Sequence, residues 1–267
     1  MDMNLSSACK LLTLLGILGL SACSSTMPSM GGSSGNTITG GAGGSNAEGQ
    51  NSALEKCDAP LGTLSVYEDQ TGDWWDYYNR NYSSLGSTVP VIRTMIQQSN
   101  CFVIVERGVS MSSMNTERDL MNSGELRGGS DFGKGQLVAA DYTVSPSVQF
   151  SAKDTGGVGG LIGGWVGAVA GGLKSNEAAT TLLLIDNRSG VQVSSAVGNA
   201  KNWDYGIFGG LFAGGFFGAG GYTKTPEGKV ITAAFADSYN NMVKALRNYK
   251  AQNVEGGLGK GGKLKVN

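Results

Sequence analysis

Two glycine-rich stretches without a charged side chain constrain this sequence more than any other feature. They cover residues 156–173 and 206–221 and lie inside two wider segments, residues 150–177 and 199–224, which we call the first and the second arm. Bulky apolar residues are spaced among the glycines, namely Trp165 in the first arm and Phe208, Phe212 and Phe216 in the second. Contiguous apolar surface of this kind associates in water. We therefore expect both arms to face a membrane.

The spacing within the arms is compatible with strands or with helices. As strands, each arm could cross a bilayer twice, because a tilted strand needs about 9–11 residues. Several copies would then have to close one barrel, since open sheet edges are not tolerated in lipid. As helices, the arms have the small-xxx-small spacing of packed membrane helices, with glycine at positions 206, 210, 214 and 218. Spacing alone slightly favours helices, and flexible loops would not explain the bulky apolar residues.

Aromatic residues flank the second glycine-rich stretch. Trp203 and Tyr205 precede it and Tyr222 follows it. Aromatic side chains are enriched where membrane meets water. We therefore expect these three residues to lie at that boundary.

The N-terminus predicts export and lipidation. Lys10 precedes a short apolar run, residues 11–20, which is too short to span a bilayer and is typical of a signal peptide. Leu20-Ser21-Ala22-Cys23 matches the bacterial lipobox, so we expect residues 1–22 to be removed and Cys23 to carry lipid. Ser24, in place of aspartate, favours the outer membrane. The alternative is an ordinary secretory signal with an incidental cysteine.

The rest of the chain divides by composition. Residues 23–56 are rich in glycine and serine and are expected to form a flexible tether, residues 57–250 a single folded domain, and residues 251–267 a disordered tail. Cys57 and Cys101 lie within the domain, which would occupy an oxidising compartment. They are either joined in a disulfide or present as two buried free thiols.

Charge and composition exclude several classes of function. Twenty basic residues against 21 acidic residues argue against nucleic acid as a partner. Histidine is absent, which removes the commonest general base and the commonest metal ligand. Gly133-Lys134 is followed by Gly135 and leads into a strand, so it is not a phosphate-binding loop. We expect no enzymatic activity, no metal and no cofactor.

The pattern of the domain predicts an α/β fold, a mixed sheet with packed helices. Strands are expected at residues 61–67, 101–105 and 137–150, with Pro146 placing the distal half of the last at a sheet edge. A hairpin is expected at residues 180–197, because residues 186–190 have strong turn chemistry. Helices are expected behind capping candidates at residues 83–87 with Pro90 in the first turn, around residues 109–120, and at residues 228–249. The intervening polar and aromatic residues 68–82 are expected to form a loop.

Several short motifs in a fixed order, behind the lipobox, resemble the curli secretion channel family, the CsgG/HfaB-type lipoproteins. The resemblance extends from about Leu61 to Tyr249. The motifs are Ser65-Val66-Tyr67 with Asp69-Gln70-Thr71-Gly72, Val105-Glu106-Arg107, Asn115-Thr116-Glu117-Arg118, Ala139-Ala140-Asp141-Tyr142 and Leu183-Leu184-Ile185-Asp186-Asn187-Arg188-Ser189-Gly190.

The resemblance implies a lipid-anchored protein of the bacterial outer membrane whose α/β body faces the periplasm. Copies would assemble as a homo-oligomeric ring, and each would contribute two β-hairpins, here the two arms, to one shared barrel. Unfolded fibre or adhesin subunits would leave the cell through that barrel, with the help of periplasmic accessory proteins.

The family pore is narrowed by a loop of the pattern Tyr-x-x-x-Asn-aromatic after the first strand. Tyr77, Asn81 and Tyr82 match this pattern at the same distance from Gly72, and would ring the constriction. The simpler interpretation is a solvated loop with some packed aromatic residues.

A second function is compatible with the arms. Barrel hairpins alternate an apolar lipid face with a polar lumen face, and the two glycine-rich stretches have no polar face. The alternative is therefore an envelope-organising lipoprotein whose glycine-zipper arms associate with the membrane but conduct nothing.

Overall fold

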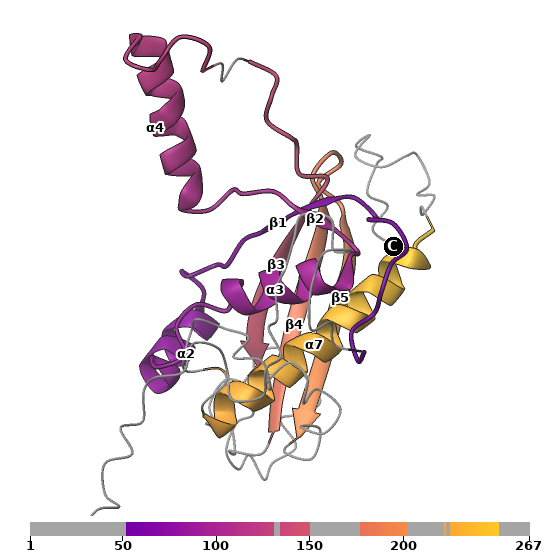
Figure 1. The fold of residues 1–267 in the computed structure, drawn as a ribbon. Helices are drawn as coiled ribbons and strands as arrows, with labels where there is room; N and C mark the ends of the chain where they lie inside the picture. Colours follow the sequence, from indigo (N-terminus) through magenta and orange to yellow (C-terminus); the bar gives the residue numbers. More distant parts are fainter. Residues whose placement is uncertain (1–51, 131–133, 150–176, 202–221, 223–224, 251–267) are drawn as a thin grey trace, which may run out of the picture.

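The computed structural model describes residues 52–130, 134–149, 177–201, 222 and 225–250 (Figure 1). The lipidation site Cys23, the glycine-rich stretches with Trp165, Phe208, Phe212 and Phe216, and the C-terminal tail lie outside the described residues. The described elements are, in chain order, β1 (Thr63–Val66), α2 (Asp73–Tyr82), α3 (Val89–Ser99), β2 (Val103–Ile104), α4 (Ser110–Ser123), β3 (Tyr142–Gln149), β4 (Glu177–Asp186), β5 (Gln192–Lys201) and α7 (Pro226–Arg247).

The strands form one mixed sheet in the order β2-β1-β3-β4-β5. β1 is parallel to both β2 and β3, whereas β3, β4 and β5 are antiparallel neighbours. The predicted hairpin is confirmed as β4 and β5. Its turn is built by the Asp186 carboxylate, which accepts hydrogen bonds from the Arg188 and Ser189 amides at 2.8 and 3.2 Å. Gly190, with φ 70°, adopts the left-handed conformation that favours glycine.

The predicted edge position of Pro146 is also confirmed. β1 pairs with β3 only from Tyr142 to Val144. Beyond Val144, this side of β3 has no strand partner among the described residues, so the missing N–H of Pro146 leaves no ladder bond unmade on that side. The predicted strand at residues 101–105 exists but is limited to Val103–Ile104, because it pairs only with the short β1.

Helices α3 and α7 cover one face of the sheet (Figure 1). α7 begins at Pro226 behind the N-cap Thr225, whose hydroxyl accepts from the Gly228 amide at 3.0 Å. The core between these helices and the sheet includes Leu64, Ile92, Leu182 and Phe235, each at most 1% exposed. The α/β fold class predicted from the pattern of strands and helices is confirmed for the described residues.

One glycine of β5 permits unusually close packing of α7. A β-carbon added at Gly198 would lie 2.2 Å from the Ala234 carbonyl oxygen and 2.2 Å from the Ser238 amide nitrogen. Both atoms belong to the backbone of α7, so no side-chain rotation could make room. A side chain at this position is therefore incompatible with the observed distance between helix and strand.

Side chains of α7 also bind the outer edge of β5. Asp237 accepts from the Asn199 amide at 3.0 Å, and Asn241 donates to the Val197 carbonyl at 3.0 Å. Unpaired strand edges invite pairing with another chain. These two bonds occupy backbone groups at the middle of that edge.

The structure joins Cys57 and Cys101 in a disulfide, with an S–S distance of 2.05 Å. The sequence had left this pairing open against two free thiols. The bond ties the segment before β1 to the end of α3. Arg247 of α7 holds the same segment through an ion pair with Glu55 at 2.7 Å.

The structure contradicts the prediction of a loop over residues 68–82. Residues Asp73–Tyr82 form helix α2, which follows the extended N-cap Gly72. The aromatic residues Trp74, Tyr78 and Tyr82 recur at intervals of four and therefore share one face of a helix. Packing of that face overrides the polar composition on which the loop was predicted.

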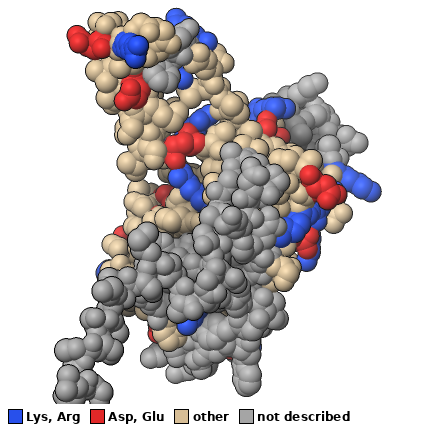
Figure 2. Space-filling view, in the orientation of Figure 1, with Lys and Arg blue, Asp and Glu red and all other residues tan. Residues whose placement is uncertain are grey.

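Helix α4 was predicted from a weak amphipathic pattern, and its existence is confirmed. None of its residues is buried, and it projects away from the sheet (Figure 1). Acidic and basic side chains lie next to one another on α4 and on the body, and neither sign forms a large patch in the view of Figure 2. No helix of the described residues is both long and apolar enough to cross a membrane.

Candidate functional site

The two arms are attached at the same end of the sheet. The first arm connects the end of β3 to the start of β4, and the registers place Gln149 opposite Ala179. The second arm begins at the end of β5, where Lys201 lies opposite Glu177 at the start of β4. Since β3 and β5 end where β4 begins, three adjacent strands meet both arms at one edge of the body. We call this region the arm end.

Helix α2 lies at the arm end, where it contacts β3 (Figure 1). Its aromatic side chains contact one another along the helix. The Tyr78 ring lies 6.0 Å from the Trp74 ring, 5.6 Å from the Trp75 ring and 6.0 Å from the Tyr82 ring, measured between centroids. Tyr78 is the one buried residue of the helix, at 1% exposure. The aromatic face of α2 is thus packed around Tyr78.

The three residues predicted for a constriction all lie on α2. Tyr77 and Tyr82 are half-buried and pack against the core, whereas Asn81 is exposed. The Asn81 side-chain amide donates to the Tyr77 carbonyl at 2.7 Å, one turn earlier in the helix. A hydrogen bond therefore links Asn81 to Tyr77. The Tyr82 ring packs against the Tyr78 ring.

Two tyrosines that lie outside the short motifs, Tyr78 and Tyr222, form a buried contact at this site. The hydroxyls of Tyr78 and Tyr222 are hydrogen bonded to each other. Both hydroxyl oxygens also lie within hydrogen-bonding distance of the Gly86 carbonyl oxygen, at 3.0 Å from Tyr78 and 3.1 Å from Tyr222. Each hydroxyl has one proton, so one of them donates to this carbonyl and the other donates either to the same carbonyl or to the first hydroxyl. Tyr222 is fully buried, so the prediction that it lies at the membrane–water boundary is wrong. Its burial between α2 and the turn before α3 could not be seen in the sequence.

Glu68 holds the segment before α2 against the start of α3. Its carboxylate accepts from the Thr88 amide at 2.8 Å, from the Thr88 hydroxyl at 2.6 Å and from the Ser87 hydroxyl at 2.8 Å. Next to it, Asp69 accepts from the Thr71 amide at 2.9 Å and from its hydroxyl at 2.7 Å. These hydrogen bonds keep the pKa of Asp69 below its usual value. The Asp69-Gln70-Thr71-Gly72 motif thus forms the turn that starts α2.

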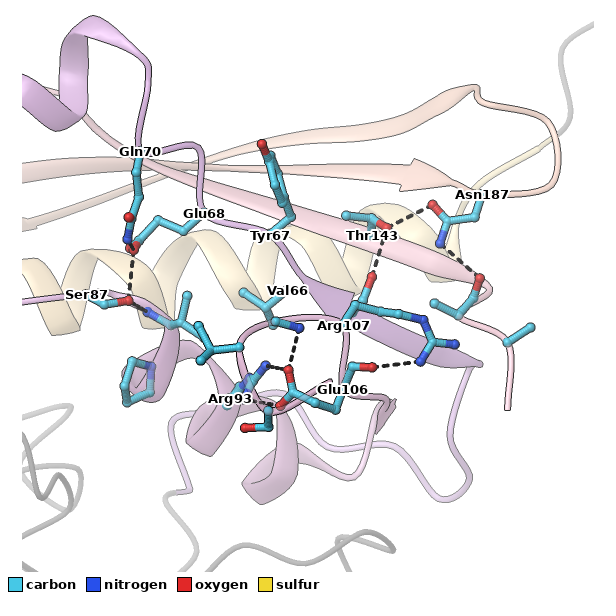
Figure 3. A pocket seen from close by; sticks show the side chains of 18 residues that line it. Val66, Tyr67, Glu68, Gln70, Ser87, Arg93, Glu106, Arg107, Thr143 and Asn187 are labelled. Carbon is cyan, nitrogen blue, oxygen red and sulfur yellow. Dashed lines mark hydrogen bonds and ion pairs between the residues drawn. The ribbon is translucent and has the colours of Figure 1, made fainter. Parts of the chain in front are cut away.

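A pocket of about 830 Å³ lies between β1, the start of α3 and the segment before α4 (Figure 3). Arg93 and Glu106 form a two-point ion pair in it, at 2.8 and 3.0 Å. The hydrogen bond from Arg93 is the main reason that the pKa of Glu106 is lowered. Arg107 donates to the Val138 carbonyl at 2.5 Å. The charged groups of the Val105-Glu106-Arg107 motif are therefore engaged with their own chain.

The motifs Ala139–Tyr142 and Leu183–Gly190 meet at the opposite end of the sheet from the arms. The Asp141 carboxylate accepts from the Thr63 amide at 3.0 Å and binds Arg188 at 2.6 Å. The Asn187 side chain donates to the Ala140 carbonyl at 2.9 Å. Their hydrogen bonds hold β1, β3 and the β4–β5 turn together, which is a structural role. Among the residues described, no group of three or more cysteines or carboxylates is placed to hold a metal ion.

Comparison with known proteins identifies one family. Residues 43–262 match the family described as the curli production assembly/transport component CsgG. No individual curated protein matches the chain significantly. The matched residues include the whole sheet, all four described helices and both arms.

Proposed function

The chain belongs to the CsgG family of curli production assembly/transport components, and from this premise we propose that it is a pore-forming lipoprotein of the outer membrane. The family forms a transport channel of the cell envelope and is not an enzyme. In the proposal, Cys23 anchors the chain in the outer membrane and the body faces the periplasm. Copies assemble in a ring, and unfolded fibre or adhesin subunits pass through the shared pore.

The arm end carries this proposal. β3 and β4 are hydrogen-bonded antiparallel neighbours up to the pair Gln149–Ala179, where the first arm begins. A β-hairpin continues such a pair without any change of register, whereas a helix would have to break it. β5 reaches the same edge beside β4, so the second arm starts next to the first. This arrangement favours hairpins over the helices that the glycine spacing suggested.

The location of α2 supports a constriction at the mouth of the barrel. Helix α2 lies at the arm end, and Tyr78 connects it to Tyr222, directly after the second glycine-rich stretch. Tyr77, Asn81 and Tyr82 would then face the substrate path at the point where the body meets the barrel. In a ring, one set of these side chains from each copy forms a polar and aromatic collar.

The test is conductance of the purified full-length protein in planar lipid bilayers, with electron microscopy of the same sample. We expect ring-shaped particles, and larger single-channel conductance for Tyr77→Ala and for Tyr82→Ala. Tyr249→Ala is the matched control, because Tyr249 is a partly exposed tyrosine outside the arm end. Equal conductance for all variants and the wild type would exclude the constriction.

The second candidate function is an envelope-organising lipoprotein without a pore. It is favoured by the missing polar face of the glycine-rich stretches. This alternative predicts monomers or dimers in mild detergent and no conductance. Rings that conduct would exclude it.

A further inference from the structure

We propose that Tyr78 and Tyr222 are positioning residues of the constriction, which fix α2 to the end of the second arm through the Gly86 carbonyl. We call the three residues the tyrosine junction. The effect on the constriction rests on the proposed pore function, whereas the contacts among these three residues do not. Neither tyrosine belongs to the Tyr-x-x-x-Asn-aromatic pattern, so the inference adds two residues that this pattern does not contain.

The junction brings together segments that are far apart in the chain. Tyr78 and Tyr222 are 144 residues apart, and their hydroxyls are hydrogen bonded. Gly86 belongs to the turn between α2 and α3, and its carbonyl oxygen lies 3.0 and 3.1 Å from the two hydroxyl oxygens, within hydrogen-bonding distance of both. Gly86 has φ 69°, a conformation that favours glycine. One carbonyl thus joins α2, the turn to α3 and the residue at which the second arm re-enters the body.

The junction is buried, so its hydrogen bonds cannot be replaced by hydrogen bonds to water. Tyr78 is 1% exposed and Tyr222 is fully buried, so a displaced hydroxyl would lose its partner without gaining water. Burial raises the pKa of Tyr78 well above its usual value, and the hydroxyl keeps its proton. The two hydroxyls can share the Gly86 carbonyl only while α2 stays in this position, so the junction defines where α2 lies.

Helix α2 depends on packing for its position, and Tyr78 is the most deeply buried part of that packing. It is only 10 residues long, and Gly72 at its N-cap makes no side-chain hydrogen bond to the first turn. A helix of this length is marginal in water and depends on packing. Since Tyr78 is its one buried residue, a shift of Tyr78 moves the whole helix. Tyr77 is adjacent, and Asn81 and Tyr82 follow within about one turn, so the proposed constriction moves with it.

The structure offers a matched control in Tyr239. This tyrosine of α7 is also buried, at 1% exposure, and its hydroxyl is hydrogen bonded to the buried Ser99 hydroxyl. Tyr239→Phe removes a buried tyrosine hydroxyl, as Tyr222→Phe does, but it leaves the junction intact. A general loss of stability should affect both variants, whereas loss of positioning should affect only the junction variants.

The experiment compares Tyr78→Phe, Tyr222→Phe and Tyr239→Phe in the full-length, detergent-purified protein. Hydrogen exchange of the α2 amides should become about fivefold faster in the two junction variants, the effect of losing one typical buried hydrogen bond. It should stay at the wild-type rate in Tyr239→Phe. In bilayers, transitions of the channel to other conductance levels should become more frequent by a similar factor in the same two variants.

The two readouts separate the inference from the pore function. Faster exchange restricted to the junction variants, in particles that do not conduct, would support the positioning of α2 and reject the pore. Conducting rings with unchanged α2 exchange in Tyr222→Phe, or with equal changes in Tyr239→Phe, would overturn the inference and leave the pore intact. If a single variant fails to fold, the double variant Tyr78→Phe with Tyr222→Phe replaces it, because it removes both hydroxyls together. Wild-type exchange in that double variant would equally overturn the inference.

Discussion

Gly198→Ala should destabilise the body strongly. The new β-carbon would lie 2.2 Å from two backbone atoms of α7 and 2.8 Å from a third, the Ser238 α-carbon. Relief requires α7 to move away from β5 by more than 1 Å, since ordinary contacts are about 3.4–4 Å. That movement opens gaps along a helix that is buried over most of its length.

Overpacking of a well-packed core costs about 1–3 kcal/mol and sometimes more. Because both contacts are with backbone, we expect the upper end, about 3 kcal/mol. For a domain of this size, that loss lowers the melting temperature by about 6–12 °C. The assay is urea unfolding of the full-length protein in mild detergent, followed by tryptophan fluorescence.

Gly128→Ala is the control for this experiment. A β-carbon at Gly128 would have no atom within 4 Å, and its backbone lies outside the left-handed region. The control should match the wild type or be slightly more stable, because alanine restricts the unfolded chain. Equal stability of Gly198→Ala and Gly128→Ala would refute the close approach of α7 to β5.

Three other predictions test the body. Cys101→Ser should lower the free energy of unfolding by about 4 kcal/mol, because the disulfide to Cys57 closes a loop of 44 residues. The electrophoretic mobility of the wild type should change on reduction, and an unchanged mobility would contradict the bond. Glu106→Gln should flatten the acid side of the stability profile. The folded-state pKa of Glu106 is lowered, so its ion pair stabilises the fold above the unfolded-state pKa and is lost as pH falls through the folded value. An equal change of the urea midpoint in the wild type and in Glu106→Gln between pH 6 and pH 3, roughly the range that spans carboxylate titration, would contradict this. The double variant Asp237→Ala with Asn241→Ala should self-associate more than the wild type, because it frees backbone groups at the β5 edge. Light scattering measures this, and an unchanged particle size would show that these two side chains do not protect the edge.

Local patterns in the sequence were sufficient to predict the elements that are determined by interactions between residues close together in the chain. The β4–β5 hairpin follows from the turn residues 186–190, and α7 follows from the apolar side of residues 228–249, although the structure begins the helix at Pro226. The same holds for the edge position of Pro146, because proline lacks the N–H that a central strand needs. The order of short motifs was also enough to identify the family.

Helix α2 shows where local reasoning failed. Its polar and aromatic composition predicts a loop, and its aromatic repeat of four residues was the signal that could have corrected this. That repeat stabilises a helix only when something covers Tyr78. One residue that Tyr78 meets there is Tyr222, which neither spacing nor composition connects to α2.

By itself, the sequence determined the family, the fold class and the elements whose hydrogen bonds close within a few residues. The tertiary structure alone decided which distant residues meet: the disulfide partners, α7 against Gly198, and the tyrosine junction with α2. The reason is physical. Turn chemistry and amphipathic repeats act over a few residues, whereas burial depends on the atoms that the folded chain brings from elsewhere.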